Sequence, residues 1–329
     1  MHNDGIPFRV DSMYELPSLK HKAIVAEFKS AGVAWVNAYP SLMADCVDRW
    51  GLKLLGTASA GLPMNMIHYA ETREGHPVVL KVGVPHPEQK TELLALRYYE
   101  GRHAVRVIDW DDKSGAILMD RIFPGTNLRA YGFRADRNEA TGSQVSIELM
   151  NALPVPAVAI DGLPTFDEWL SLAFSRFRNH TKSNDHFLGF INLTESLYAE
   201  IKTTYPETFL LHGDLHHENI LRDDAVGWVA IDPKGVIGPK IIECGRFIQN
   251  FIEDEIPSAT SLGDATDKEI MLILEERLKV FNNVTGFDQH HLAMVTFIDQ
   301  VLSTCWSMNA GQVVDLRKIK LIKNLLNGV

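Results

Sequence analysis

The sequence predicts an α+β protein of two lobes, a small and mostly antiparallel β lobe followed by a larger, mostly helical lobe. Apolar runs alternate with short polar turns between residues 50 and 122, whereas long helical patterns dominate after residue 123. Pro124-Gly125 separates the two patterns and predicts a hinge. We therefore expect residues 1–122, including an N-terminal helix, to form the first lobe and residues 123–329 the second.

The first lobe is expected to contain two hairpins and one helix. Apolar segments flank a Gly-containing turn at residues 71–75, and two more flank residues 111–114, as in β-hairpins. Pro87–Glu100 is rich in Glu, Leu and Ala without internal Gly or Pro, which predicts a helix. The strands are expected at residues 50–56, 64–70, 77–82, 105–110 and 115–120.

The second lobe shows long helical patterns that only two short apolar segments interrupt, at residues 208–212 and 227–232. Because ligands commonly bind in clefts between lobes, we expect the functional residues to come from both. The helices are expected at residues 137–152, 166–180, 187–204, 241–254, 267–282, 288–309 and 314–326.

The chain of 329 residues is acidic, with 42 Asp or Glu and 32 Lys or Arg residues and a formal net charge of −10. Such a surface repels nucleic-acid phosphates and anionic membranes, so neither is an expected partner. It is compatible with a cationic ligand, although acidity can equally serve only to keep a protein soluble. The sequence does not distinguish a monomer from a homodimer.

The remaining features of the composition indicate a cytoplasmic protein. Cys46, Cys244 and Cys305 are far apart and odd in number, which disfavours a disulfide framework or a structural zinc site. Residues 1–20 lack the apolar core of a secretory signal, and no apolar run is long enough to span a bilayer.

The strongest functional signal is the segment HGDLHHENIL at residues 212–221, followed by WVAIDPKG at residues 228–235. Transfer of a phosphoryl group to a hydroxyl needs a carboxylate that orients the hydroxyl and accepts its proton. It also needs oxygen ligands that hold Mg²⁺ on the nucleotide phosphates. Asp214, Asn219 and Asp232 supply this set, in the order typical of a kinase catalytic loop.

Two other interpretations of this segment remain open. Asp residues that follow strands are often turn or cap residues. His212, Asp214, His216 and His217 also suit a transition-metal site in a hydrolase, because imidazole and carboxylate are ligands of such metals. The other histidines do not form the spaced motifs that such a hydrolase needs, so the kinase interpretation is favoured.

The first lobe supplies a candidate nucleotide clamp. Lys81 lies in an apolar strand, where burial is costly without a partner, and Glu92 on the following helix can pair with it. Glu88 is a rival for this pairing, and an exposed edge-strand lysine is the alternative for Lys81. Glu92 is preferred because the apolar stretch Leu93–Leu96 that follows it should pack on the sheet.

Two backbone segments of the first lobe are candidates for nucleotide contacts. The loop from Gly56 to Gly61, which includes Ser59, has small residues that let backbone N–H groups approach a phosphate. It matches neither GxGxxG nor a P-loop and can equally be a hairpin loop. Asp120 to Ile122, at the end of the last β segment, can present its backbone to a purine edge by its place along the chain.

These stretches resemble the aminoglycoside and hydroxyurea phosphotransferase family, in particular its streptomycin 6-kinase branch. The resemblance spans residues 50 to about 250. HGDLHxxN marks the wider superfamily, and IDPKG is more specific to this branch. Other matching stretches are Val79–Lys81, the helix from Thr91 to Gly101 and the segment from Gly115 to Leu128, which ends in PGTNL.

The resemblance implies a protein-kinase-like fold, ATP as phosphoryl donor with GTP as an alternative, Mg²⁺, and an alcohol group as acceptor. It implies Asp214 as catalytic base and Asn219 and Asp232 as metal ligands. It also implies that Lys81 and Glu92 clamp the nucleotide phosphates, and that His212 braces the loop rather than reacts.

The sequence departs from the family pattern at two places. His217-Glu218 replace the small residues that usually precede the loop Asn, and the usual Asp after IDPKG is missing, with Glu243 as its candidate replacement. Both departures concern the acceptor pocket more than the phosphotransfer residues. Candidates for contact with the acceptor are Glu243, Glu253, Asp254 and Asp299. A charge run such as that of Glu253 and Asp254 is usually a solvated face, and Asp299, on an otherwise apolar helix, can instead be a buried, paired structural carboxylate.

We therefore expect a small-molecule kinase that phosphorylates a hydroxyl of a streptomycin-like aminoglycoside. The alternative is a metabolic kinase for a sugar, amino sugar or hydroxyurea-like compound. A nucleotide-binding pseudokinase is disfavoured because Lys81, Asp214, Asn219 and Asp232 are all present. A protein substrate is disfavoured because no long activation loop follows Asp232.

Overall fold

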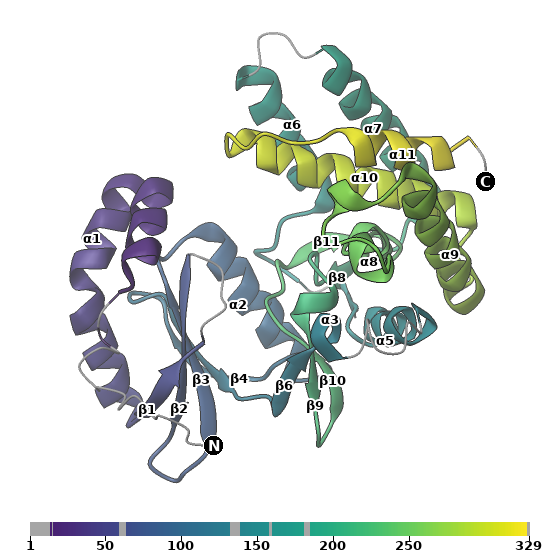
Figure 1. Cartoon of the computed structure of the whole chain (residues 1–329). Helices are drawn as coiled ribbons and strands as arrows, with labels where there is room; N and C mark the ends of the chain where they lie inside the picture. The colour runs from purple at the N-terminus through teal and green to yellow at the C-terminus, as the bar shows by residue number, and fades with distance from the viewer. Residues whose placement is uncertain are drawn as a thin grey trace. The chain divides into compact units, whose positions relative to one another are not determined.

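The computed structural model describes residues 14, 16–58, 64–131, 139–157, 160–180 and 185–327. These residues divide into two compact units, which Figure 1 shows in purple to blue and in teal to yellow. The smaller unit runs to Gly101 and includes Val105–Ile122, and the larger unit contains Arg102–Ala104 and continues from Phe123.

The smaller unit is built on an antiparallel five-stranded sheet with the order β1-β2-β3-β5-β4. On β3, the alternate residues Val78, Leu80 and Val82 form one core with the side chains of α1. The intervening Lys81 therefore lies on the opposite face of the sheet. The elements are α1 (Ser18–Trp50, with non-helical backbone at Lys29), β1 (Lys53–Thr57), β2 (Asn65–Glu71), β3 (Pro77–Gly83), α2 (Pro87–Tyr99), β4 (Val107–Asp111) and β5 (Ala116–Asp120).

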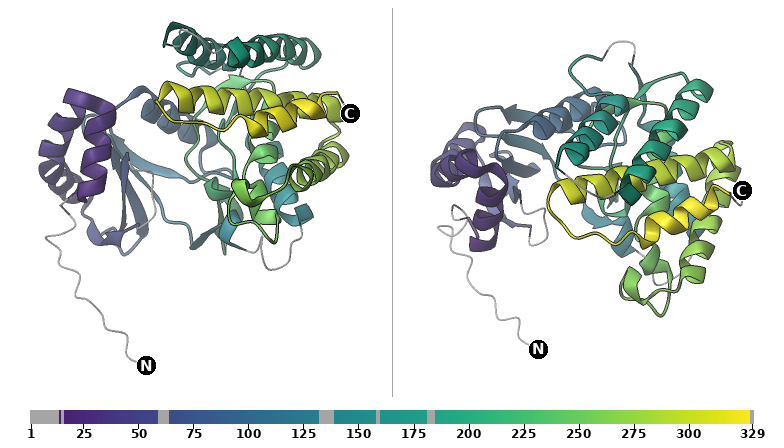
Figure 2. Two further views of the ribbon diagram at one scale, coloured as in Figure 1. Left: turned by 45° about the horizontal axis from the view of Figure 1, so that its top comes forward. Right: turned by 90° about the horizontal axis from the view of Figure 1, so that it is seen from above.

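The larger unit is mostly helical and is organised around α10, which contacts α6, α7, α8, α9 and α11 (Figure 2). Every residue of α10 from Leu292 to Leu302 is buried, as expected for a helix that neighbours cover on all sides. The helices are α3 (Leu128–Tyr131), α5 (Glu139–Ala152), α6 (Phe166–His180), α7 (Asp185–Thr204), α8 (Ile242–Gln249), α9 (Asp267–Thr285), α10 (Gln289–Asn309) and α11 (Arg317–Leu325). Among the described helices, none is both long and apolar enough to cross a membrane.

Two small antiparallel sheets carry the motif segments of the larger unit. Their orders are β10-β9-β6 and β11-β8-β7, so β8 and β9, which flank the HGDLHHEN segment, belong to different sheets. The strands are β6 (Pro124–Asn127), β7 (Val155–Pro156), β8 (Phe209–Leu211), β9 (Ile220–Asp223), β10 (Gly227–Ala230) and β11 (Val236–Gly238).

The predicted helix over residues 241–254 is too long at its C-terminal end. α8 ends at Gln249, Asn250 is extended, and a separate 3₁₀ turn covers Ile252–Glu255. The buried guanidinium of Arg277 causes this early end, because its NH1 donates to the carbonyls of Phe247, Ile248 and Asn250. These bonds satisfy the last carbonyls of α8, which a longer helix would need for itself.

Candidate active site

In the smaller unit, the structure pairs Lys81 with Glu92. Lys81 Nζ donates to Glu92 Oε1 at 2.6 Å, and the two residues are only 2% and 7% exposed. Glu88 lies one turn earlier on α2 and is exposed. A buried lysine is tolerated only with such a partner, and the pair keeps an ammonium group at a defined place on the sheet.

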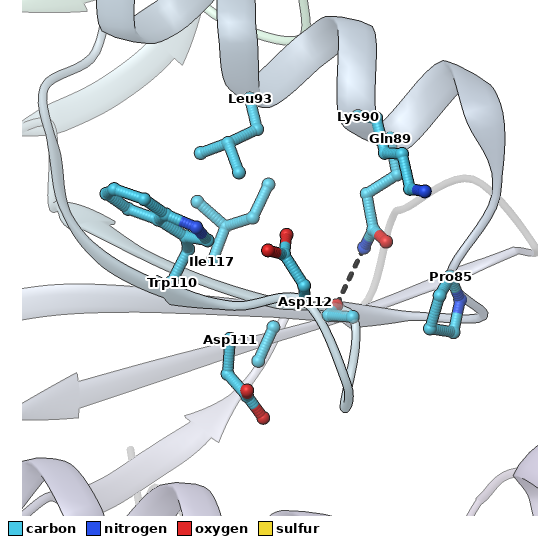
Figure 3. Close-up of a pocket in the computed structure, with 10 residues that line it drawn as sticks. Pro85, Gln89, Lys90, Leu93, Trp110, Asp111, Asp112 and Ile117 are labelled. Carbon is cyan, nitrogen blue, oxygen red and sulfur yellow. Dashed lines mark hydrogen bonds between the residues drawn. The ribbon is translucent and has the colours of Figure 1, made fainter.

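α2 is attached to the sheet beside this pair. Pro87 at its first turn and the left-handed Glu100 at its end set the length of the helix. Gln89 Nε2 donates to the backbone oxygen of Gly115 at 2.7 Å, the dashed bond in Figure 3. Figure 3 also shows Leu93 of α2 above Ile117 of β5, so polar and apolar contacts together hold Glu92 near Lys81.

The other predicted nucleotide contacts of the smaller unit are only partly described. Gly56 lies in β1 next to a register shift, with φ of 156° and open space where a side chain would be. Such a bulge lets the backbone approach a ligand. Ser59 and Gly61 fall outside the described residues.

Asp120 and Ile122 end the smaller unit. The carboxylate of Asp120 accepts from Arg106 Nε at 2.6 Å and lies 2.8 Å from His76 Nε2. Its side chain is therefore engaged within the sheet, and only the backbone of this segment is available for the contact predicted with a purine. Ile122 is half-buried.

In the larger unit, backbone hydrogen bonds join the two halves of the motif. Lys234 N and Gly235 N donate to His212 O at 2.8 and 3.2 Å, and Ile231 N donates to Asn219 O at 2.9 Å. The segment that leaves β10 is thereby held against the segment between β8 and β9. Asp214, Asn219 and Asp232 consequently lie on one hydrogen-bonded assembly of loops.

His212 is the brace of this assembly. Its ring is buried, Nε2 donates to Ile231 O at 2.8 Å, and Nδ1 accepts from Asp214 N at 3.2 Å. Burial lowers the pKa of His212 to about 4, so the imidazole is neutral at pH 7. With both ring nitrogens used by the backbone, His212 is not available as a metal ligand.

The departure from the family pattern at His217-Glu218 also has a structural explanation. His217 is buried and stacks on Phe247 with ring centroids 3.9 Å apart, whereas Glu218 is exposed and pairs with Arg129 NH1 at 2.7 Å. His217 thus serves as a core aromatic side chain. Among the described residues, no three His, Cys, Asp or Glu side chains form a metal-binding group.

Glu243 supports the loop from inside the protein. It is 3% exposed, and its two oxygens accept from His212 N at 2.6 Å and from Gly213 N at 2.9 Å. Burial raises the pKa of Glu243 to about 7, although the two backbone hydrogen bonds act in the opposite direction and lower it. The expectation that Glu243 contacts the acceptor is therefore corrected, because both oxygens are already bonded in the interior.

Gly213 allows the same loop to pack closely. Its φ is +76°, and a side chain would place Cβ 2.9 Å from the Trp169 ring and 3.0 Å from Val236. Both the backbone conformation and the lack of space require glycine here. Asp214 is the next residue, so this packing also fixes the backbone position of Asp214.

The three polar side chains of the motif suit a magnesium–nucleotide complex. Asn219 Nδ2 donates to Asp214 O at 3.0 Å, which orients the amide and leaves Oδ1 as its acceptor. Asp232 has a left-handed φ of 57°, an uncommon backbone conformation that is concentrated at functional sites. An amide oxygen and a carboxylate are ligands that Mg²⁺ takes together with phosphate oxygens.

The predicted acceptor contacts are mostly engaged within the protein. Asp254 forms a two-point pair with Arg129, with distances of 2.5 and 3.1 Å. Asp299 is 7% exposed and accepts from Gln249 Nε2 at 2.8 Å. Glu253 is half-buried beside them. Asp299 is thus a buried, paired carboxylate, and Asp254 lies in an ion pair rather than on a solvated face.

One residue of this region was missed at the sequence level. Arg246 on α8 has its Nε 3.3 Å from Asp214 Oδ1 and 3.3 Å from Asp299 Oδ1. The sequence signal that could have identified Arg246 was its spacing of three residues from Glu243. This spacing places both residues on one face of α8, whose other residues are mostly buried. A charged residue on such a face indicates a buried partner.

Comparison with known proteins gives one family. A sequence model of the aminoglycoside/hydroxyurea antibiotic resistance kinases matches residues 49–311. The hydroxyurea phosphotransferase of Kitasatospora aureofaciens is 27% identical over 240 residues, which are 70% of this chain and 66% of that protein. The streptomycin 6-kinase of Streptomyces griseus is 28% identical over 218 residues, 63% of this chain and 66% of that protein. The chain thus aligns with about two thirds of the length of each relative.

A solved structure agrees at the level of the fold. The choline kinase LicA from Streptococcus pneumoniae superimposes with a TM-score of 0.57 over 88% of this chain and 97% of that chain, at 14% identity. The expected kinase-like α+β fold is confirmed. The expected resemblance to the phosphotransferase family is confirmed as well.

Proposed function

The chain belongs to the aminoglycoside/hydroxyurea antibiotic resistance kinase family, and from this premise we propose that it transfers the γ-phosphoryl group of ATP to a hydroxyl of a small molecule. The observation that carries the proposal is the braced loop around Asp214. His212, Glu243 and the backbone of Lys234 and Gly235 all hold it in place.

Asp214 is the proposed catalytic base. Its carboxylate orients the acceptor hydroxyl and takes its proton as the hydroxyl oxygen forms a bond to the γ-phosphorus. The bond from the γ-phosphorus to the β,γ-bridging oxygen breaks, and ADP leaves. The half-buried position of Asp214, with a side chain 22% exposed, gives it access to an acceptor.

Asn219 and Asp232 are the proposed magnesium ligands. Asn219 Oδ1 is oriented by the hydrogen bond of its own amide to Asp214 O, and Asp232 adds a charged oxygen. Mg²⁺ bound there neutralises charge on the nucleotide phosphates.

Lys81 is the proposed contact for the α- and β-phosphates, held by Glu92. The 2.6 Å pair directs the ammonium group, a threefold donor whose positive charge suits phosphate oxygens. ATP is the proposed donor and GTP the alternative, and a donor of this kind suits a cytoplasmic reaction.

The first proposed acceptor is a streptomycin-type aminoglycoside, because one relative of the chain, from Streptomyces griseus, is a streptomycin 6-kinase. One observation favours a second candidate. Asp254 and Asp299, two acidic groups expected to attract a cation, are paired with Arg129 and Arg246. The second candidate is therefore a small neutral acceptor such as a hydroxyurea-like compound. One relative of the chain is a hydroxyurea phosphotransferase.

The proposal is tested by measuring ADP release with ATP or GTP over a panel of streptomycin, hydroxyurea, choline and simple sugars. Product mass is recorded for each active compound. We expect Mg²⁺-dependent addition of one phosphoryl group to a member of the first two classes. Turnover only with choline or sugars would reject the acceptor proposal, and no phosphorylated product with any compound would count against kinase activity.

A matched pair of variants separates the proposed chemistry from contaminating activity. Asp214→Asn removes the base, and Asp224→Asn changes an exposed aspartate in the turn after β9. Activity should fall by orders of magnitude in the first variant and persist in the second.

A further inference from the structure

Arg246 brings a permanent positive charge to Asp214 and Asp299. Its Nε lies 3.3 Å from Asp214 Oδ1 and at the same distance from Asp299 Oδ1. The side chains are 17%, 22% and 10% exposed, respectively, so solvent screens these contacts only in part. An arginine placed between two carboxylates attracts both and restricts their rotation.

The close packing of α8 on α10 makes this arrangement possible. A side chain at Gly245 would place Cβ 2.4 Å from Val295 O and 3.1 Å from Asp299 Cβ, so only glycine permits this approach. The next residue along α8 is Arg246, and Asp299 is on the facing surface of α10. The position of Arg246 is therefore determined by two packed helices rather than by a loop.

The contact with Asp214 is one of charge and not of an aligned hydrogen bond. Within the described part of the chain, Arg246 Nε has no hydrogen-bond partner of acceptable geometry. The ring of His216 is a second neighbour of Asp214, with Nε2 3.8 Å from the same Oδ1. Both contacts thus involve Oδ1 of Asp214. Oδ2 is therefore the oxygen that can accept the proton of an acceptor hydroxyl.

Asp299 is in turn held from its far side. Gln249 Nε2 donates to Asp299 Oδ2 at 2.8 Å, and Lys318 Nζ of α11 donates to Gln249 Oε1 at 2.5 Å and to Gln249 O at 3.0 Å. A continuous polar network therefore runs from the catalytic loop through α8 and α10 to α11. Each member of such a network restricts the next.

We propose that Arg246 is a positioning residue for the catalytic carboxylate Asp214, and that Asp299 holds Arg246 in place. The inference rests on the proposed function of Asp214. It assigns Asp299 to the support of the base and not to binding of the acceptor. Phosphoryl transfer depends largely on positioning, so a base that rotates freely should slow turnover more than it weakens binding.

Kinetics of three variants test this role. Arg246→Met removes the charge at similar length, Arg246→Lys keeps the charge without the planar group, and Asp299→Asn removes the partner. We expect Arg246→Met to lower kcat by about 10- to 100-fold with KM for ATP changed less than about twofold. Arg246→Lys should recover part of the loss. Asp299→Asn should lower kcat less, and adding it to Arg246→Met should cause little further loss, because the two residues act in series.

The control is Arg178→Met, which breaks an arginine pair with Glu195 on α6 and α7. It should leave kcat unchanged. Folding of each variant is verified by its melting temperature and by nucleotide affinity. A correctly folded Arg246→Met with kcat within about twofold of the unsubstituted protein would overturn the inference, and so would additive losses in the double variant.

A second readout does not depend on turnover. In protein labelled with nitrogen-15 at arginine, the Arg246 Nε–H signal is assigned by its loss in Arg246→Lys. We expect that signal to move in Asp214→Asn and in Asp299→Asn but not in Asp224→Asn. An unmoved signal in Asp214→Asn would refute the contact. If no acceptor is phosphorylated, the proposed function fails, and this measurement still decides whether Arg246 holds Asp214.

Discussion

Lys81 Nζ and Glu92 Oε1 lie 2.6 Å apart in the interior of the smaller unit, on neighbouring faces of β3 and α2. The side chains are only 3% and 9% exposed. Each charge offsets the cost of burying the other, so removal of one partner is unfavourable for the ion that remains.

Lys81→Met is therefore expected to destabilise the smaller unit by roughly 3–5 kcal/mol and to weaken ATP binding. Lys81→Met with Glu92→Gln should recover much of the stability, because neither buried ion remains, but not the affinity for ATP. Urea unfolding and calorimetric titration with ATP measure the two effects. Lys90→Met, an exposed substitution on the same helix, is the control and should change neither. Equal stability of the single and the double variant would contradict the account.

Asp214→Asn is expected to lower kcat by about 10²- to 10⁴-fold, because a neutral amide cannot accept the hydroxyl proton. Nucleotide affinity should stay within about twofold, since Asp214 is the proposed base and not a phosphate ligand. Single-turnover kinetics and ATP titration provide the two values. Turnover near that of the unsubstituted protein would refute the base assignment.

Asp232→Asn is expected to raise the Mg²⁺ concentration needed for ATP binding by about tenfold or more, because it removes a charged ligand. Asparagine tolerates the left-handed backbone conformation of this position, so the fold should persist. The measurement is ATP affinity as a function of Mg²⁺, with Asp224→Asn as control. An unchanged Mg²⁺ dependence would exclude Asp232 as a ligand.

His68 should contribute to acid sensitivity of the smaller unit. Its Nε2 lies 2.8 Å from Tyr39 Oη, and burial lowers the pKa of His68 from 6.5 to about 4. Because the folded pKa lies below the unfolded one, the stabilisation is complete above pH 6.5 and is lost as the pH falls to about 4. The loss is on the order of 3 kcal/mol. His68→Gln should lack this part of the pH dependence in urea unfolding, and parallel pH profiles would contradict the prediction.

Glu243 should act with the opposite sign in the larger unit. Burial raises the pKa of Glu243 from 4.5 to about 7, so its contribution to stability is complete below pH 4.5 and is lost as the pH rises through about 7. The unfolding free energy of the unsubstituted protein minus that of Glu243→Gln should fall by on the order of 3 kcal/mol over this range. Unfolding of both proteins at pH 4.5, 6 and 8 tests this, and a difference that grows with pH would contradict it.

Local patterns were sufficient to predict most elements of both units. The apolar segment of β3 and the apolar residues of α10 correspond closely to the structure, since each depends on residues that are near in sequence. The end of α8 was not predictable in this way. It depends on Arg277, which comes from α9 and satisfies the carbonyls of α8 through a long-range contact.

The residues of the candidate site also differ in how far local sequence predicts them. The sequence by itself determined the residue types and order of Asp214, Asn219 and Asp232, because the spacing of such a motif is a local property. It also indicated that Lys81 needs a partner, because a charge in an apolar strand is costly.

Only the tertiary structure decided which charges meet in the larger unit. It placed Glu243 beneath the loop as a backbone acceptor and paired Asp254 with Arg129, although sequence reasoning had assigned both carboxylates to the acceptor. It also brought Arg246 of α8 between Asp214 and Asp299. The physical reason is that an ion pair depends on distance in space and on burial, and helix packing sets both between segments that are far apart in the chain.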